Sequence, residues 1–351
     1  DGTYTMTVSA ADVLVAAGGP GTGITLTAKF VGNDNMADGA GTVDVSISAV
    51  AKIENGSTTT YVGNLDDAFK TENDGATITM LNDVELAGNE SIRSSCSCTL
   101  DLNGHTIRQS AVTPTTFSIG SGSTVTIKDS GTGGKIESSN NTIEVYGGTL
   151  SIESGTVSGF YGVQIHRGTV NIFGGVISGE ETGLWVHNSG KAVLSGGTLI
   201  GRKAVSINAD ASVTLKNLLA EGYAYHRNNL PVTKAEGWVD SNTWGEVSLD
   251  TKAVLTGTVT VKKCNHTGEG VCEYTPNEGA ETHAMTCLAC GYAGAAEDCQ
   301  YTYTPDPSGL SKEAKAAIGT RPVYDLRSTA RYLRLTAEVY PDLMKKVERS
   351  C

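Results

Sequence analysis

The chain has few aromatic residues and no long apolar run. Of its 351 residues, 5 are phenylalanine and 3 are tryptophan, whereas 43 are glycine and 8 are proline. Such a turn-rich, aromatic-poor composition is typical of proteins built from many short strands. No stretch of about 18 consecutive apolar residues occurs, so the sequence predicts no membrane insertion.

Positive charge is also scarce. The chain carries 26 Lys and Arg against 38 Asp and Glu, which gives a formal net charge of -12. A phosphate backbone is held by clustered basic residues, so we expect no nucleic-acid partner. The sequence opens at Asp1 without a signal peptide and closes without a sorting motif. We therefore expect a matured or excised piece of a longer protein.

What the sequence does contain is a repeat of short apolar pairs. In the first column the pairs recur every 21 residues: Val163 with Ile165, Leu184 with Val186, and Val205 with Ile207. A second column has steps of 20 to 22 residues: Leu150 with Ile152, Val170 with Ile172, Ala192 with Leu194, and Val213 with Leu215. A third column holds Val157, Ile177 and Leu199. Such constant spacing indicates a solenoid, in which each repeat buries its apolar face against the next.

The repeating unit is a strand rather than a helix. Each apolar pair alternates with its neighbours at period two, as in Leu184, Trp185 and Val186. The glycines between the pairs leave no room for a helix of about ten residues. Three strands per turn, stacked in parallel about 4.8 Å apart, describe a right-handed parallel β-helix. About six such coils fit between Ala76 and Ala220, so the predicted fold class is all-β.

The register extends towards the N-terminus with wider steps. Its pairs there are Ile78 with Met80, Leu100 with Leu102, and Val125 with Ile127. Leu65, Ala68 and Phe69 have i, i+3, i+4 spacing, which predicts a short helix capped by Asn64 or Asp66. A helix at this point would cover the open end of the stack, which otherwise exposes strand edges.

The segments outside the repeats predict other structures. Alternating runs at 4–8, 24–28 and 43–47 indicate antiparallel strands of a partial sandwich. The glycine-rich stretch 18–23 is interpreted as a plain loop, because no helix pattern follows it to form a phosphate site. The predicted division is 1–55 for this strand segment, 56–75 for the capping helix, 76–225 for the β-helix, 226–262 for a strand-rich connector, 263–303 for a cysteine-rich module, and 304–351 for a tail that is either helical or a truncated domain.

Three motifs carry a family resemblance. They are YVGNLDDAF at 61–69, DGATITML at 74–81 and LDLNGHTI at 100–107. Together they resemble the opening of pectate-lyase-like β-helix domains, and most closely those in large cell-surface proteins of Gram-positive gut bacteria. The resemblance covers roughly residues 60–300. It implies an extracellular adhesion or glycan-binding module, or an active or degraded polysaccharide-cleaving enzyme.

Residues 263–303, here named the cysteine module, contain residue types that bind metal. Cys264 and His266 form one C-x-H knuckle, and Cys287 and Cys290 form a C-x-x-C-G knuckle about twenty residues later. Zinc binds such a set of four tetrahedrally, and four protein ligands leave no open position for a substrate. The sequence therefore predicts one structural zinc and no catalytic cofactor. The surface proteins that the chain resembles carry similar knuckles between their modules.

Two other interpretations of the cysteines stay open. An extracellular compartment is oxidising, so the cysteines of the module are also candidates for disulfides, with Cys272 and Cys299 as one bridge. Free thiols are the third interpretation. Cys96 and Cys98 alternate in step with the apolar pair Leu100 and Leu102, so we expect both to be small core residues.

The outward strand positions define a candidate binding face. One outward column contains Glu144, Gln164, Trp185 and Ser206, and the column two residues further on contains Tyr146, His166, His187 and Asn208. The predicted ligand-binding residues are Trp185, His187, His166, Tyr146, Gln164, Glu144, Asn208 and Arg167. Aromatic rings can stack on a pyranose while polar side chains bind its hydroxyls. The alternative is that these residues merely fill outward strand positions, which polar and aromatic side chains suit.

Catalysis is less favoured than binding. Polysaccharide lyases of the fold that the chain resembles need several carboxylates around calcium, and glycosidases need paired carboxylates. The carboxylates of the predicted coils do not repeat at one column on adjacent turns: Asp101, Asp129, Glu137, Glu144, Glu153 and Asp210. His166, His187, Tyr146 and Arg167 could still abstract a proton, so the question of an enzyme stays open.

The favoured hypothesis is an extracellular, adhesin-like surface module that is monomeric and displays one face of its β-helix. Its expected partner is a glycan or a host or microbial surface protein, including an immunoglobulin. Solenoids suit either partner, because they present long and rigid surfaces.

Overall fold

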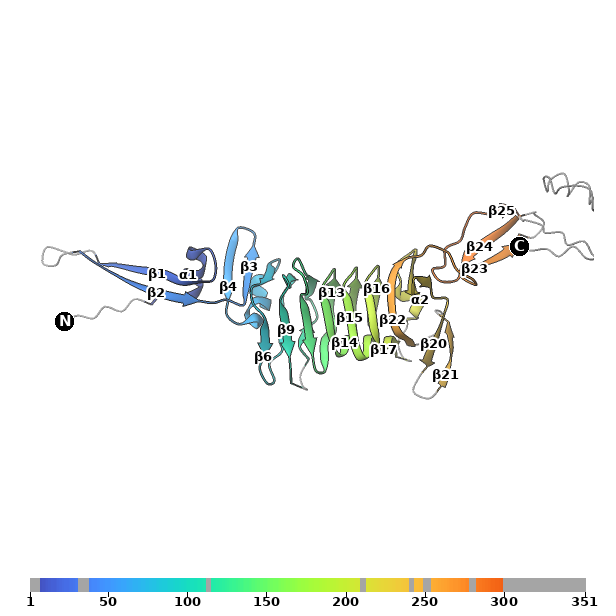
Figure 1. The fold of residues 1–351 in the computed structure, drawn as a ribbon, viewed down its shortest axis with the longest axis horizontal. Coiled ribbons are helices and arrows are strands. Elements are labelled where there is room, and N and C mark those ends of the chain that lie inside the picture. Colours follow the sequence, from blue (N-terminus) through green and yellow to red (C-terminus); the bar gives the residue numbers. More distant parts are fainter. Residues whose placement is uncertain are drawn as a thin grey trace, which may run out of the picture. The chain divides into compact units, whose positions relative to one another are not determined.

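The structure, a computed structural model, describes residues 7–30, 38–111, 115–208, 213–239, 243–248, 254–277 and 282–298 (Figure 1). These residues lie mostly in β-strands and form two compact units, each of which is described by itself. Within the described ranges, no helix is both long enough and apolar enough to cross a membrane. The predicted all-β fold class is confirmed.

The larger unit is built around a parallel β-helix of about six turns, as the repeat predicted. Its strands are β5 (Thr77–Met80), β6 (Val84–Leu86), β7 (Ile92–Ser94), β8 (Cys98–Asp101), β9 (Thr106–Gln109), β10 (Phe117–Ile119), β11 (Thr124–Lys128), β12 (Lys135–Ser138), β13 (Asn141–Ile152), β14 (Thr156–Ile172), β15 (Val176–Val186), β16 (Lys191–Leu194) and β17 (Thr198–Ile207). Strands of successive coils lie side by side in Figure 1 and pair in parallel along three columns, which we name the first, second and third sheets.

The first sheet carries the candidate binding face. It consists of β7, β10 and parts of β13, β14, β15 and β17. Its core ladder pairs Ile165 with Val186 and Val186 with Ile207. The first two side chains are fully buried, and Ile207 is 6% exposed. The 21-residue register is therefore confirmed, and the residues between these apolar positions point outward.

The other two sheets follow the predicted columns as well. The second sheet contains β5, β8, β11, β16 and the C-terminal parts of β13 and β14. The third contains β6, β9, β12 and the first residues of β14, β15 and β17, where Val157, Ile177 and Leu199 pair in order. Cys96 and Cys98 are buried at 2% and 7% exposure, as expected for small core residues.

The last predicted repeat is different from the expectation. Val213 and Leu215 were placed in the second column of strands, but Leu215 begins the short helix α2 (Leu215–Leu218). The hydroxyl of Thr214 accepts a hydrogen bond from the amide of Asn217, which caps the helix and diverts the chain from strand geometry. Leu215 and Leu218 are both buried, so the helix closes the second sheet after β16 with apolar side chains.

The N-terminal end of the stack is covered by a hairpin and two short 3₁₀-helices. The hairpin of β3 (Ala51–Asn55) and β4 (Thr58–Val62) adds to β5 in antiparallel fashion. The predicted short helix forms as the 3₁₀-helices η1 (Leu65–Phe69) and η2 (Thr71–Asn73), and the side chain of Asn64 caps η1. Phe69 is fully buried against Phe117, with ring centroids 4.9 Å apart. The hairpin crosses the predicted boundary at residue 55 and belongs to the β-helix.

The N-terminal segment contains a helix that the strand patterns did not predict. Helix α1 (Ala10–Ala17) is capped by Ser9 and ends at Gly18, whose positive φ of 76° favours glycine. The runs at 24–28 and 43–47 do form strands, β1 (Gly21–Phe30) and β2 (Gly39–Ile47). They pair only with each other within the described residues, which is a hairpin rather than a sandwich. Most of the run at 4–8 lies outside these residues.

The C-terminal end of the β-helix is closed by antiparallel strands. β22 (Val254–Lys263) runs antiparallel to β17 and also pairs with β18 (Tyr223–Arg227), next to β19 (Leu230–Pro231). β20 (Lys234–Val239) and β21 (Thr243–Ser248) form a separate hairpin. Most of the described residues between 223 and 263 therefore lie in strands.

The smaller unit contains a three-stranded antiparallel sheet of β23 (Cys272–Pro276), β24 (Thr282–Cys287) and β25 (Glu297–Asp298). The predicted tail lies outside the described residues.

Candidate functional site

The predicted outward column is present on the first sheet. Glu144 pairs with Gln164, Gln164 with Trp185, and Trp185 with Ser206 on four successive coils. The same column continues towards the N-terminus through Ser118 and Arg93, which the sequence reasoning missed. Each step along it corresponds to about 4.8 Å, the spacing of paired strands.

Four rings on the first sheet contact one another across three coils: Trp185 from this column, and Tyr146, His166 and His187 from the positions two residues further along each strand. The ring of Tyr146 stacks on His166, with centroids 4.8 Å apart and planes inclined by 2°. His166 stacks on His187 at 4.6 Å, and His187 contacts Trp185 at 4.2 Å. We name Tyr146, His166, His187 and Trp185 the aromatic layer. The expected adjacency of the two histidines is therefore present.

One end of the aromatic layer is fixed by Asn208. Its side-chain oxygen accepts a hydrogen bond from the indole nitrogen of Trp185 at 2.8 Å, and its amide nitrogen lies 2.9 Å from Nδ1 of His187. Because the amide oxygen is used by the indole, the amide nitrogen must donate to Nδ1. His187 is then a neutral imidazole whose proton is on Nε2. The two rings are held by one side chain from the next coil.

The other end of the layer is fixed by Glu144. Its carboxylate accepts hydrogen bonds from the hydroxyl of Thr115, from the phenol of Tyr146 at 2.6 Å and from the amide of Asn141 at 3.0 Å. Nε2 of His166 lies 3.5 Å away, and the side chain of Glu144 is only 9% exposed. Burial, together with the bond to the neighbouring carboxylate, raises the pKa of Tyr146 to about 12, so its phenol stays protonated.

The predicted ligand-binding residues differ in how much of them solvent can reach. Tyr146 is 47% exposed and the side chain of His166 is 27% exposed, whereas Glu144 and Gln164 lie beneath the rings at 7% and 5%. The rings therefore form the outer surface, and the buried polar residues support them. A register shift after β13 residue Val145 brings the backbone of exposed Arg167 opposite Tyr146, outside the layer.

A hollow of about 460 Å³ lies at the Tyr146 end of the aromatic layer. It is lined by Arg93, Ser118 and Gly120 from the preceding coils, and by Glu144 and Tyr146. We name it the Arg93 hollow. Because the step from Arg93 to Ser118 is 25 residues and the step from Ser118 to Glu144 is 26, a search for a 21-residue repeat does not find this hollow. A second, shallower groove of about 560 Å³ runs along the third sheet.

Three of the other carboxylates that were candidates for catalysis make structural contacts. Asp101 accepts hydrogen bonds from the backbone amides of Asn103 and Ser130. Asp129 accepts from the amides of Gly104, Gly131 and Gly134. Glu137 instead pairs with Arg108 and Lys135 at the surface. Asp210, also a candidate, lies outside the described residues.

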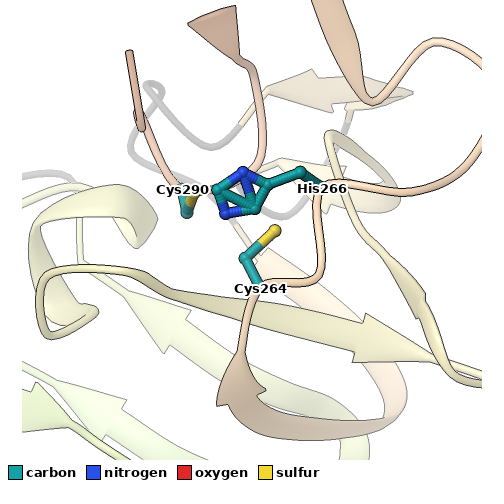
Figure 2. Close-up of side chains that lie close together, drawn as sticks. All are labelled: Cys264, His266 and Cys290. Carbon is teal, nitrogen blue, oxygen red and sulfur yellow. The ribbon is translucent and has the colours of Figure 1, made fainter. Parts of the chain in front are cut away.

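The cysteine module brings three of the four predicted zinc ligands together. The donor atoms of Cys264, His266 and Cys290 all lie within 4.8 Å of one another, and Figure 2 shows the three side chains gathered at one point. Two thiols and an imidazole are a donor set that zinc prefers. This cluster could hold a metal ion, which is compatible with the predicted structural zinc.

The fourth predicted ligand, Cys287, has a second cysteine beside it. In the hairpin of β23 and β24, Cys287 stands directly opposite Cys272. Burial, and then the neighbouring Cys287, raise the pKa of the Cys272 thiol. The sequence reasoning instead paired Cys272 with Cys299, which lies outside the described residues. Strand register, which spacing alone does not give, identifies Cys287 as the neighbour.

Comparisons of the chain with models of known protein families, with curated proteins and with solved structures found no match. The structure itself shows the parallel β-helix of about six turns. The resemblance to pectate-lyase-like surface domains has only the sequence motifs at 61–107 behind it.

Proposed function

We propose that the β-helix is an extracellular binding module that presents the aromatic layer to a glycan. The observation that carries the proposal is the unbroken contact of four rings across three coils. A row of rings offers an apolar surface on which sugar rings can stack, and the phenol oxygen of half-exposed Tyr146, which donates its proton to Glu144, can still accept a hydrogen bond from a sugar hydroxyl. The cell-surface setting comes from the family resemblance and forms part of the same proposal.

The layer has the rigidity that a binding surface needs. Glu144 fixes one end and Asn208 the other, so the rings lose little further freedom when a ligand binds. Two coil steps give the layer a length of about 10 Å. A short stretch of a linear glycan, lying along the β-helix axis, matches such a surface.

The test of this proposal is Trp185→Ala in the full chain. An oligosaccharide bound by the wild type on a glycan array should bind more weakly by about 1 to 3 kcal/mol, because a partly buried ring anchor is lost. Phe173→Ala is the matched control, since Phe173 is an aromatic residue outside the layer that is 53% exposed. Equal effects of the two substitutions, or an array without any bound oligosaccharide, would contradict the proposal.

A protein ligand is the alternative within the binding class. Aromatic residues are enriched at protein interfaces, and a host or microbial surface protein, including an immunoglobulin, could cover the same layer. A pull-down from serum with wild-type and Trp185→Ala chains separates this case from the glycan case. Recovery of a serum protein by the wild type alone, with no glycan bound on the array, would favour the protein ligand.

The contact of His166 with buried Glu144 keeps a catalytic alternative testable. A histidine oriented by a carboxylate can act as a general base in a polysaccharide lyase or glycoside hydrolase. Replacing both His166 and His187 by Gln keeps a donor and an acceptor at each position but removes two of the four rings, so binding should weaken without being lost. If products with unsaturated sugars form with the wild type and disappear with the double variant while the glycan still binds, the module is an enzyme.

We also propose that the cysteine module holds one structural zinc ion. Cys264, His266 and Cys290 would supply three ligands and Cys287 the fourth, as the knuckle spacing predicts. Elemental analysis of the purified chain should find about one equivalent of zinc, and Cys290→Ser should release it. Comparing Cys287→Ser with Cys272→Ser identifies the fourth ligand. If the purified protein contains no zinc and mass spectrometry finds a Cys272–Cys287 disulfide, the zinc proposal is wrong and the module is held by a disulfide.

A further inference from the structure

We propose that the Arg93 hollow binds a negatively charged sugar residue, one that bears a carboxylate or a sulfate, with Arg93 as its anion-binding residue. The inference rests on the proposed glycan-binding function and adds the ligand's chemical class and the direction in which it lies.

The hollow exists because small residues stand between large ones on the first sheet. Arg93, Ser118 and Glu144 occupy the same outward position on successive coils, so Arg93 and Glu144 are about 10 Å apart with only a serine between them. Gly120 lies two residues after Ser118 in the chain, and a Cβ atom added to Gly120 would meet no other atom within 4 Å. The space of about 460 Å³ is large enough for one sugar ring.

Arg93 supplies the positive end of the hollow. Its side chain is exposed, and among the described residues no ion-pair or hydrogen-bond partner of its guanidinium is found; its backbone amide donates to Asp66 at 3.1 Å. By contrast, Arg108 pairs with Glu137 and Arg202 pairs with Glu181. A guanidinium next to an open hollow offers two parallel donors, which match the geometry of a planar carboxylate or of two sulfate oxygens.

Glu144 supplies the opposite end and sets the direction of the ligand. Its oxygens are already occupied by Thr115, Tyr146 and Asn141, so it supports the wall of the hollow rather than accepting from a ligand. Its negative charge still repels an anion. The acidic group of a bound sugar is therefore expected at Arg93, with the uncharged part of the ring towards Tyr146.

The remaining walls suit the rest of a sugar ring. Tyr146 is 47% exposed, and because its ring lies parallel to His166 on one side, its other face is available for stacking. The hydroxyls of Ser91 and Ser118 line the hollow and can bond to sugar hydroxyls. The chain's net charge of -12 opposes an anion little here, since charges beyond about 8 Å are screened at physiological ionic strength.

The experiment uses titration calorimetry of the full chain with matched oligosaccharides. The probes are a glucuronate-containing tetrasaccharide, the same tetrasaccharide after its carboxyl groups are reduced to alcohols, and a sulfated tetrasaccharide with no carboxylate. We expect the wild type to bind at least one acidic probe about tenfold or more tightly than the reduced probe, as a charge-assisted pair with arginine commonly gives. The two acidic probes distinguish carboxylate from sulfate.

Two variants locate the effect in the hollow. Arg93→Gln should abolish the preference for the acidic probe, while Lys191→Gln, which removes an exposed positive charge from β16 of the second sheet, should leave it unchanged. Gly120→Leu should weaken the acidic probe by filling the hollow, because its backbone φ and surroundings accept a side chain. Unchanged melting curves by circular dichroism check that the variants fold.

The inference and the proposed function fail in different ways. If acidic and reduced probes bind equally and Arg93→Gln matches Lys191→Gln, the inference is overturned, while weakening by Trp185→Ala would still support the aromatic layer as a glycan site. If no acidic probe binds the wild type at millimolar concentration, the inference is overturned as well. If neither these probes nor an array of neutral glycans binds, both fail.

Discussion

The register of the first sheet can be tested by placing a charge in its core ladder. Val186 is fully buried and pairs with Ile165 on one side and with Ile207 on the other. In Val186→Asp the loss of the buried apolar side chain costs about 2 kcal/mol. Keeping the new carboxyl group neutral at pH 7 requires a pKa about three units above its usual 3.9, which costs about 4 kcal/mol more.

The expected destabilisation of about 6 kcal/mol is a large part of the stability of an ordinary domain. Urea unfolding followed by circular dichroism should show it as a shift of the midpoint to lower urea. The folded-state pKa of the new carboxyl group lies above its unfolded value, so the penalty is greatest at neutral pH and shrinks as the pH falls towards 4. If the new carboxyl group were exposed to solvent rather than buried, the destabilisation of Val186→Asp would not depend on pH in this way.

Val193→Asp is the matched control. Val193 lies on β16 of the second sheet at 41% exposure, at an outward position of the same kind of strand. We expect it to cost less than about 1 kcal/mol, the range of strand propensities at exposed sites. If both substitutions shifted the urea midpoint equally, or if neither shifted it, the assignment of inward and outward positions would be refuted.

Two further predictions concern stability elsewhere in the larger unit. His226 is 2% exposed, and burial is the largest cause that lowers the pKa of its imidazole. The folded protein therefore favours the neutral imidazole, and this part of the stability should be lost as the pH falls below about 6.5. The variant His226→Asn keeps a donor for the carbonyl of Ala224, so the melting temperature of the variant should fall less between pH 7 and pH 5 than that of the wild type. Equal falls in melting temperature would contradict this prediction. A Cβ atom on Gly179 would lie 1.9 Å from the carbonyl oxygen of Thr182, so Gly179→Ala should cost about 1 to 3 kcal/mol, whereas Gly120→Ala should be neutral in the same urea titration.

The sequence allowed the β-helix to be predicted where its coils are equal in length. Between Val163 and Ile207 the step is constant, so inward and outward residues could be assigned one by one, and the ring contact of His166 with His187 followed from that assignment. Coils with steps of 25 and 26 residues broke the pattern, and Arg93 was missed for this reason.

Other features depend on tertiary contacts that periodicity does not contain. The pattern identifies Glu144 and Gln164 as outward residues, yet both are buried because the rings two positions further on fold back over them. Helix α1 had a local signal, since Ser9 and Gly18 are favourable at its two ends, but the alternating runs around it favoured strands. The pairing of Cys272 with Cys287 needed the register of a hairpin.

The two fixed ends of the aromatic layer have different chemistry, and this has a consequence for binding. At the Asn208 end, one side-chain amide accepts a hydrogen bond from the indole nitrogen of Trp185 and donates one to Nδ1 of His187, so it holds two rings at once. At the Glu144 end, one buried carboxylate accepts hydrogen bonds from Thr115, Asn141 and Tyr146. A ligand that stacks on the rings therefore meets side chains that are already held in place at both ends of the layer, so binding costs less free energy for ordering them.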